Sequence, residues 1–217
     1  MTPFDFQFPY TSQRMPLLAR NAVATSQPLA AQAGLRMLLK GGNAVDAILA
    51  TAISLTVLEP TSNGIGSDLF AILWDGRELV GLNAWGRAPA AVTPGRYAGQ
   101  EAIPQRGWEA VTVPGAVSGW VALWERFGKL PFAQLLEPAI GYAENGFFVT
   151  PIVARVWRGL KAQYLKFPDV LACFYPDGSS PAPGTSLALP TLASTLRERG
   201  VDAHAVAAVA ERSADGC

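Results

Sequence analysis

The fold of this chain is set by residues 41–66, which read GGNAVDAILATAISLTVLEPTSNGIG. The two glycines at its start can adopt the left-handed conformation that ends a preceding helix. Asn43 is a good N-cap, and Asp46, three residues later, can return a hydrogen bond to the cap. An uncharged apolar run then reaches residue 58, and Pro60 stops the helix. The stretch therefore predicts a buried helix that leads into a glycine-bearing loop.

The flanking segments carry equally local signals. Asp75-Gly76 separates two apolar runs, which is a strong hairpin signal. Prolines and glycines delimit further helices along the chain. The expected strands are residues 23–25, 69–74, 78–83 and 110–113, the expected helices are residues 28–38, 44–58, 117–127, 131–144 and 151–165, and residues 174–184 form a long surface loop by their turn residues.

Composition limits the possible functions. Half of the 217 residues are apolar and only 16% are charged, below the ~25% that is usual for soluble domains. This low charge indicates that part of the surface is buried against something else. The 17 basic and 17 acidic side chains balance to zero net charge, and no basic stripe alternates with aromatic residues. We therefore expect no nucleic-acid partner.

The cysteines and the N-terminus indicate no special compartment. Cys173 and Cys217 give neither a disulfide framework nor the spacing of a metal site, so we expect a core thiol and a tail thiol. The first twenty residues mix polar side chains with prolines, so no signal-peptide core forms. The longest uncharged run, residues 47–58, is well short of the ~20 residues needed to cross a bilayer. We expect a cytoplasmic protein that has no membrane span.

Several separate motifs resemble the gamma-glutamyltransferase family of N-terminal-nucleophile enzymes. That family opens with a G-G-N-A-V-D-A helix, a V-x-E-P-x-S-x-G-I-G turn and a strand hairpin, which correspond to residues 41–83. The resemblance covers residues 20–203 in uninterrupted order, between an N-terminal arm of residues 1–19 and a non-family tail of residues 204–217. Further matching motifs are residues 81–83, 86–91, 113–120, 127–132, 136–140 and 143–147.

The resemblance implies an α+β fold, in which two antiparallel sheets lie between helical layers in an αββα sandwich. This chain would supply outer helices and a few strands, and so only part of the sandwich. Family members cut themselves to expose a threonine whose own α-amine acts as base for its hydroxyl. That threonine would lie downstream on a small subunit. We therefore expect no catalytic residue, no metal and no cofactor in this chain, and a missing catalytic subunit as its partner.

Four hydroxyls near the C-terminus are poor candidates for such a nucleophile. They precede helix-like or loop sequence instead of a buried strand, so we expect ordinary surface hydroxyls. They are Thr185, Ser186, Thr191 and Thr195. His204, the only histidine, has no neighbouring acid to orient it in a Ser-His-Asp triad.

The loop Gly64-Ile65-Gly66 suggests phosphate binding only at first sight. It follows a helix, whereas phosphate-binding loops of this kind join a strand to a helix. We therefore expect no phosphate site here.

The tail departs abruptly from the family after Ala203. Relatives continue with an aromatic pair and a Gly-rich turn, whereas an alanine-rich segment, residues 204–217, follows here. We interpret this tail as the product of a frameshift or premature stop in a longer gene.

Two hypotheses about function follow. The chain is the large-subunit part of an amidohydrolase or acyltransferase that needs its catalytic half, or it is a non-catalytic remnant with no activity of its own.

The resemblance also locates substrate-binding candidates. In glutamyl-transferring relatives, an arginine just ahead of an Ala-Pro pair binds the α-carboxylate of the donor. Counting back from Ala88-Pro89, this position is Trp85. Arg87 lies two residues later on the same side of a strand, and it either substitutes for the missing arginine or is a surface residue. Tryptophan there favours an aromatic or apolar acyl group over glutamate, so the expected ligand is a small-molecule gamma-glutamyl or related acyl amide.

Overall fold

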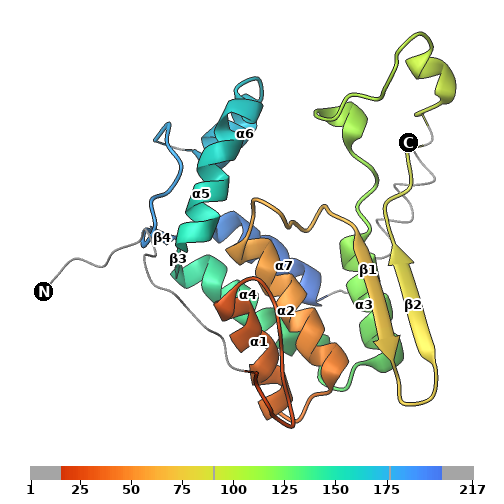
Figure 1. Ribbon diagram of the computed structural model, residues 1–217, viewed down its shortest axis with the longest axis vertical. Coiled ribbons are helices and arrows are strands. Elements are labelled where there is room, and N and C mark those ends of the chain that lie inside the picture. The colour runs from red at the N-terminus through yellow and green to blue at the C-terminus, as the bar shows by residue number, and fades with distance from the viewer. Residues whose placement is uncertain (1–15, 90, 176, 202–217) are drawn as a thin grey trace, which may run out of the picture.

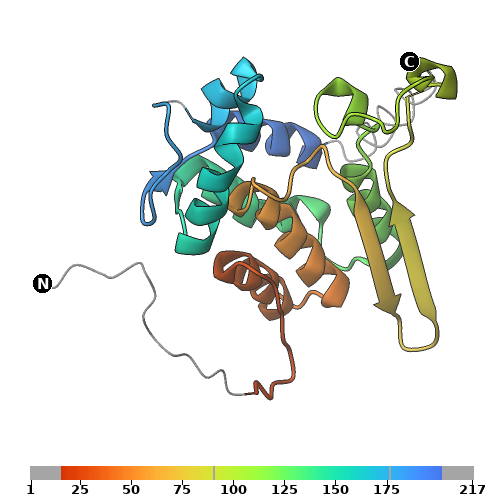
Figure 2. The same cartoon turned by 45° about the horizontal axis from the view of Figure 1, so that its top comes forward.

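The computed structural model describes residues 16–89, 91–175 and 177–201. Figure 1 shows a helical body with a strand hairpin along one side. Figure 2 shows that the hairpin stands at the edge of the molecule, with a single helix, α3 (Ala116–Phe127), lying against it. No helix within the described ranges is long and apolar enough to cross a membrane.

Helices α1 (Pro28–Leu39) and α2 (Ala44–Leu58) confirm the two helices expected here. Pro28 occupies the first turn of α1, where its missing N–H costs nothing. Gln27 caps this turn, because its side-chain oxygen accepts two backbone N–H groups. Gly41 has φ of 86° between the two helices, so the predicted left-handed turn is present.

The predicted capping box of α2 is also present, and it reaches further than expected. The Asn43 side chain accepts the N–H groups of the first turn, and Asp46 Oδ2 accepts the N–H of Asn43 at 2.8 Å. The other oxygen, Asp46 Oδ1, accepts the N–H groups of Lys129 at 3.0 Å and Leu130 at 3.2 Å. Asp46 is fully buried. One carboxylate therefore joins the start of α2 to the loop that follows α3.

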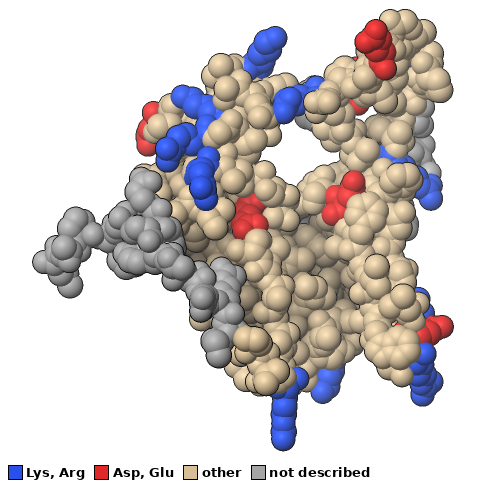
Figure 3. Space-filling model, viewed as in Figure 1, with Lys and Arg blue, Asp and Glu red and all other residues tan. Residues whose placement is uncertain are grey.

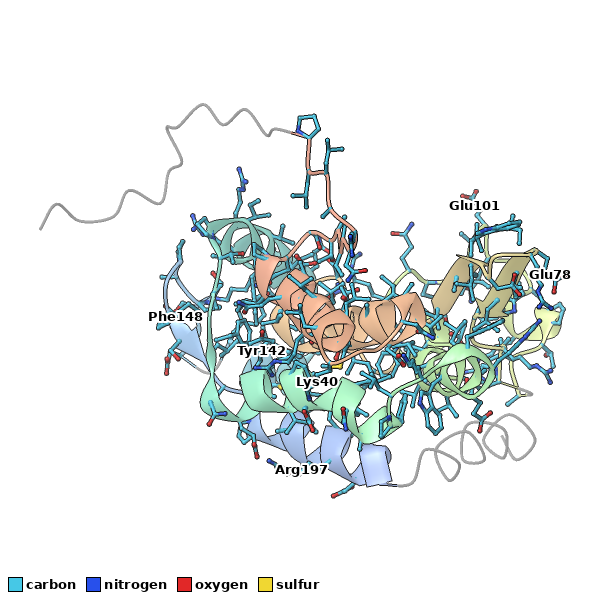
Figure 4. The ribbon with its side chains drawn as sticks, turned by 90° about the horizontal axis from the view of Figure 1, so that it is seen from below. Lys40, Glu78, Glu101, Tyr142, Phe148 and Arg197 are labelled. Atoms are coloured by element: carbon cyan, nitrogen blue, oxygen red, sulfur yellow. The ribbon has the colours of Figure 1, made fainter. Side chains whose placement is uncertain are left out.

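The core is a layered helical bundle. Helix α2 packs between α1 and α4 (Phe132–Asn145), and α4 also packs against α7 (Pro190–Val201). Figure 4 shows α4 between α1 and α7, and the hydroxyl of Tyr142 on α4 donates to the backbone oxygen of Leu29 on α1. Helix α2 is apolar on nearly all sides because it is buried on nearly all sides. The large apolar side chains that are fully buried in this bundle are Met37, Leu49, Ile53, Leu58, Leu135, Leu136 and Leu196.

The hairpin forms as predicted, with its second strand one residue later. Strand β1 (Leu69–Trp74) pairs antiparallel with β2 (Leu79–Ala84), in a register that runs from Leu69 opposite Ala84 to Trp74 opposite Leu79. The turn is closed by Asp75, whose Oδ1 accepts the N–H groups of Arg77 and Glu78. One face of the hairpin packs on α3 through Leu69, Ala71, Leu73 and Leu82.

The remaining helices differ from expectation. The predicted helix of residues 151–165 is shorter, since α5 (Pro151–Leu160) is followed by the 3-10 turn η3 (Lys161–Tyr164). Helix α6 (Pro168–Phe174) was not expected. The predicted surface loop begins at a buried residue, because the Tyr175 ring packs in the core and its hydroxyl donates to the Trp157 backbone oxygen at 2.9 Å. Strands β3 (Phe147–Phe148) and β4 (Ser186–Leu187) pair at the other end of this loop.

Two predicted strands were wrong. Residues 23–25 have no strand assignment and pair with no strand in the described part of the chain, and Val23 instead lies against Gly34 of α1. Ala110 ends the 3-10 turn η2 (Trp108–Ala110), and in residues 111–113 one backbone bond, from Val113 N to Arg87 O at 2.9 Å, replaces a ladder. Both segments have β-prone residues, but a strand requires a partner backbone. The described strands form two separate two-stranded sheets at opposite sides of the helices, so no sandwich is present in this part of the chain.

The prediction that Cys173 is a core thiol was also wrong, since this side chain is exposed. Helix α6 turns its neighbours Leu171 and Phe174 toward the core instead. Cys217 and His204, like the rest of the tail, lie outside the described residues.

Candidate functional site

Three segments meet where the hairpin joins α3. They are residues 67–68 before β1, residues 84–87 at and after the end of β2, and residues 112–116, which lead into α3, and we call them together the hairpin junction. The Ser67 backbone oxygen accepts the N–H groups of Gly115 at 3.2 Å and Ala116 at 2.8 Å. The start of α3 is therefore fixed to Ser67, two residues before β1.

Two glycines permit this close approach. A Cβ on Gly86 would lie 1.9 Å from the Val113 backbone oxygen, and a Cβ on Gly115 would lie 2.2 Å from the Ala84 backbone oxygen. Neither distance is compatible with a side chain, so both positions require glycine. The segment after β2 consequently runs in direct backbone contact with the start of α3.

Asp68 holds the same segment from the opposite side. Its Oδ1 accepts the N–H of Gly86 at 2.8 Å, while the backbone oxygen of Arg87 accepts the N–H of Val113 at 2.9 Å. The chain from Trp85 to Arg87 is thereby held between Asp68 and Val113. The sequence reasoning did not identify Asp68, although a carboxylate directly after the Gly-Ile-Gly-Ser turn was a signal that could have found it.

Trp85 and Arg87 lie in this segment, with half-buried Gly86 between them. The Trp85 side chain is 64% exposed, and the Arg87 side chain is exposed as well. The Arg87 guanidinium has no hydrogen-bond or ion-pair partner among the residues that the structure describes. Both side chains are available to a ligand or to further polypeptide.

The glycine loop borders an apolar pocket. A pocket of about 580 Å³ lies between Asn63–Gly66 and the start of α7, and its lining includes Phe174, Leu189 and Leu192. The loop is a tight turn in which Ser67 Oγ donates to the Gly64 backbone oxygen at 2.6 Å. The apolar lining of the pocket suits a hydrophobic group and gives no support for a phosphate site.

The C-terminal hydroxyls do not form a nucleophile site. Thr185, Ser186 and Thr191 are exposed, and half-buried Thr195 donates to the backbone oxygen of Thr191 at 3.0 Å. Contrary to the prediction, Thr185 does precede a strand, but β4 has two residues and pairs only with β3. Among the described residues, no three His, Cys, Asp or Glu side chains gather closely enough to hold a metal ion.

Residues 91–112 form an arm that extends from the junction and has little core of its own. Its two 3-10 turns, η1 (Pro94–Tyr97) and η2, are joined by a bidentate ion pair between Arg96 and Glu109, and Tyr97 also donates to Glu109. These two donors lower the pKa of Glu109 to about 2. The side chain of Arg106 donates to Gln163 on η3, and Figure 3 shows an opening between the arm and the helical body.

Comparison with known proteins agrees with this architecture. The gamma-glutamyltranspeptidase family model matches residues 30–203. An acylase ACY 1 proenzyme from Pseudomonas sp. strain V22 is 39% identical over 202 residues, which cover 87% of this chain and 36% of that protein. An oxamate amidohydrolase proenzyme from Klebsiella pneumoniae subsp. pneumoniae is 37% identical over 198 residues, covering 87% of this chain and 38% of that protein.

Solved structures give the same result. The crystal structure of cephalosporin acylase from Bacillus halodurans superposes with a TM-score of 0.86 at 43% identity, covering 94% of this chain and 40% of that one. Other relatives are named glutathione hydrolases. The chain spans 36% and 38% of the length of the acylase and the amidohydrolase and 40% of the cephalosporin acylase chain. It belongs to the gamma-glutamyltranspeptidase family.

Proposed function

We propose that this chain is the large-subunit part of an N-terminal-nucleophile amidohydrolase or acyltransferase, and that the hairpin junction forms part of its acyl-donor site. Relatives named as proenzymes support a protein that matures by cleavage. The chain corresponds to 36% to 38% of their length. The catalytic threonine would come from the remainder.

The proposed reaction is acyl transfer. The threonine hydroxyl attacks the amide carbon of the donor while the α-amine of the same residue takes the hydroxyl proton. The carbon–nitrogen bond then breaks, the amine leaves with a proton, and the acyl group stays on the threonine. Water or a second amine releases it. The residues of this chain would bind and orient the acyl group in this scheme.

The observation that carries the proposal is the placement of Trp85 and Arg87. Both are exposed and flank Gly86 in a segment held by Asp68 and Val113. Trp85 stands where glutamyl-transferring relatives have their carboxylate-binding arginine, so the favoured donor is an aromatic or apolar acyl amide. The relatives support variation in this group, since they are named for oxamate, cephalosporin and glutathione chemistry.

The exposed apolar face of the hairpin indicates where the rest of the complete protein would pack. Phe70, Ile72 and Trp74 are 65%, 81% and 63% exposed, and they form one apolar face of β1. We infer that further strands of the complete protein cover this face. The chain alone should therefore not turn over a chromogenic gamma-glutamyl anilide, which is also the expectation for a non-catalytic remnant.

The test uses this chain completed by the downstream polypeptide that its relatives carry. Trp85→Arg should improve the use of gamma-glutamyl donors relative to apolar acyl amides by about ten- to a hundredfold, the value of a well-placed charged hydrogen bond. Ile152→Arg is the control, because Ile152 is 62% exposed and lies on α5, outside the hairpin junction and the hairpin face. No change on Trp85→Arg together with a loss on Arg87→Ala would assign carboxylate binding to Arg87. No turnover of any acyl amide by the completed protein would favour the remnant.

A further inference from the structure

We infer that Asp68 is a positioning residue that sets the acyl-donor site by holding Trp85 and Arg87 in register. This inference rests on the proposed function. Its basis is the hydrogen bond from Gly86 N to Asp68 Oδ1 at 2.8 Å, which lies between the two candidate residues.

The side chain of Asp68 forms a hydrogen bond just beyond the last backbone pair of the hairpin. Strand pairing ends at Leu69 opposite Ala84, so the N–H of Gly86 lies beyond the last backbone pair. The Asp68 carboxylate accepts this N–H in place of a strand partner. This hydrogen bond fixes the backbone at Gly86, between Trp85 and Arg87, so its loss would let both side chains change position.

The neighbouring contacts act on other atoms of this segment. The Arg87 backbone oxygen accepts the N–H of Val113, and the N–H of Trp85 donates to Asn83 Oδ1 at 3.2 Å. Thr112 and Val113 occupy the space next to the Gly86 Cα. Among the described residues, Asp68 is the group that binds the Gly86 N–H and so fixes the backbone between Trp85 and Arg87.

The hairpin contains a matched control at its other end. Asp75 is also an aspartate whose Oδ1 accepts backbone N–H groups, at 2.8 Å from Arg77 and 2.9 Å from Glu78. A general effect of losing a turn-forming carboxylate would be equal for both residues. A positioning effect on the donor site would be confined to Asp68.

The first experiment uses the 217-residue chain and measures amide hydrogen exchange of Gly86 by NMR. Asp68→Ala should accelerate this exchange by at least about tenfold relative to the unchanged chain. Asp68→Asn should stay within about twofold, because the asparagine Oδ1 can accept the same hydrogen bond. Asp75→Ala should leave Gly86 unchanged. Equal exchange in the Asp68→Ala and unchanged chains would overturn the inference.

The second experiment uses the completed protein and its best acyl amide. Asp68→Ala should raise KM about tenfold, consistent with the loss of one charged hydrogen bond, and should leave kcat within about twofold. Asp68→Asn should restore KM, whereas Asp68→Glu should not, because it keeps the charge and displaces the acceptor. An Asp68→Asn variant as impaired as Asp68→Ala would mean that the charge acts directly, and would overturn the positioning role.

The two experiments separate the inference from the function on which it rests. If the completed protein has no activity, the proposed function fails, while the exchange of Gly86 still decides whether Asp68 holds the segment. If exchange responds and KM does not, the hydrogen bond is structural only and the positioning role is wrong. Asp68→Asn also serves as the folded reference if Asp68→Ala does not fold.

Discussion

Helix α2 and the hairpin are both apolar, yet only α2 is buried on nearly every side. Helix α2 lies among α1, α3 and α4, and the carboxylate of Asp46 is satisfied by backbone groups from two segments. Strand β1 has the same apolar character, but only its α3 face is covered, and Phe70, Ile72 and Trp74 remain exposed. The difference indicates that the described helices bury α2, whereas one apolar face of the hairpin is left uncovered.

The strongest test of this difference is Asp46→Ala in the bundle. The substitution leaves three N–H groups without an acceptor, those of Asn43, Lys129 and Leu130. We expect the free energy of unfolding to fall by about 3 kcal/mol, the scale for a charged buried acceptor. Urea denaturation measures it. Asp177→Ala, at an exposed position, should change it by less than about 0.5 kcal/mol, and a loss of similar size in both variants would contradict the special role of Asp46.

A smaller loss is expected at Tyr175→Phe, where the loop after α6 enters the core. The ring is buried and its hydroxyl donates to the Trp157 backbone oxygen at 2.9 Å. Removing the hydroxyl deletes this hydrogen bond, at a cost of about 1 kcal/mol. Tyr164→Phe is the control, because no hydrogen bond of the Tyr164 hydroxyl is present within the described ranges. A loss below about 0.3 kcal/mol would show that the contact contributes nothing measurable.

Substitutions on the exposed face of the hairpin should change the self-association of the chain and should hardly change its free energy of unfolding. We expect the isolated chain to self-associate and to bind a dye for exposed apolar surface, because the face is uncovered and the net charge is zero. Replacing Phe70, Ile72 and Trp74 by threonine keeps β-propensity and should lower dye binding severalfold, with a stability change below about 1 kcal/mol. Light scattering during size-exclusion chromatography gives the oligomeric state. A compact monomer that binds no dye would mean that the hairpin needs no further layer.

The smallest effect on stability is expected in the arm when the pH is lowered. The folded pKa of Glu109 is about 2, below its ordinary value of 4.5, because Arg96 and Tyr97 donate to the carboxylate. A lowered pKa contributes stability above the ordinary value and loses it as the pH falls from about 4.5 toward 2. The protection of residues 94–110 from hydrogen exchange, relative to the intrinsic rate at each pH, should therefore fall over this range. Glu109→Gln should abolish this pH dependence of protection, and equal protection of the arm at pH 6 and pH 3 would refute the prediction.

The sequence alone determined the features that depend on neighbouring residues. The cap at Asn43, the left-handed Gly41, the end of α2 before Pro60 and the turn at Asp75 each follow from groups within about four positions of each other. The alternation of Trp85 and Arg87 about Gly86 is of the same kind. These interactions are local, so the residue types reveal them without knowledge of the rest of the chain.

Tertiary structure decided the features that need a distant partner. Residues 23–25 and 110–113 have strand-like composition but no partner backbone in the described part of the chain, whereas Tyr175 lies in a loop-like sequence and is drawn into the core by Trp157. Asp68 appears as an ordinary polar residue until the hairpin brings Gly86 back to it, 18 positions later in the chain. A backbone N–H donates to whichever acceptor the packing supplies, and no local pattern encodes that choice.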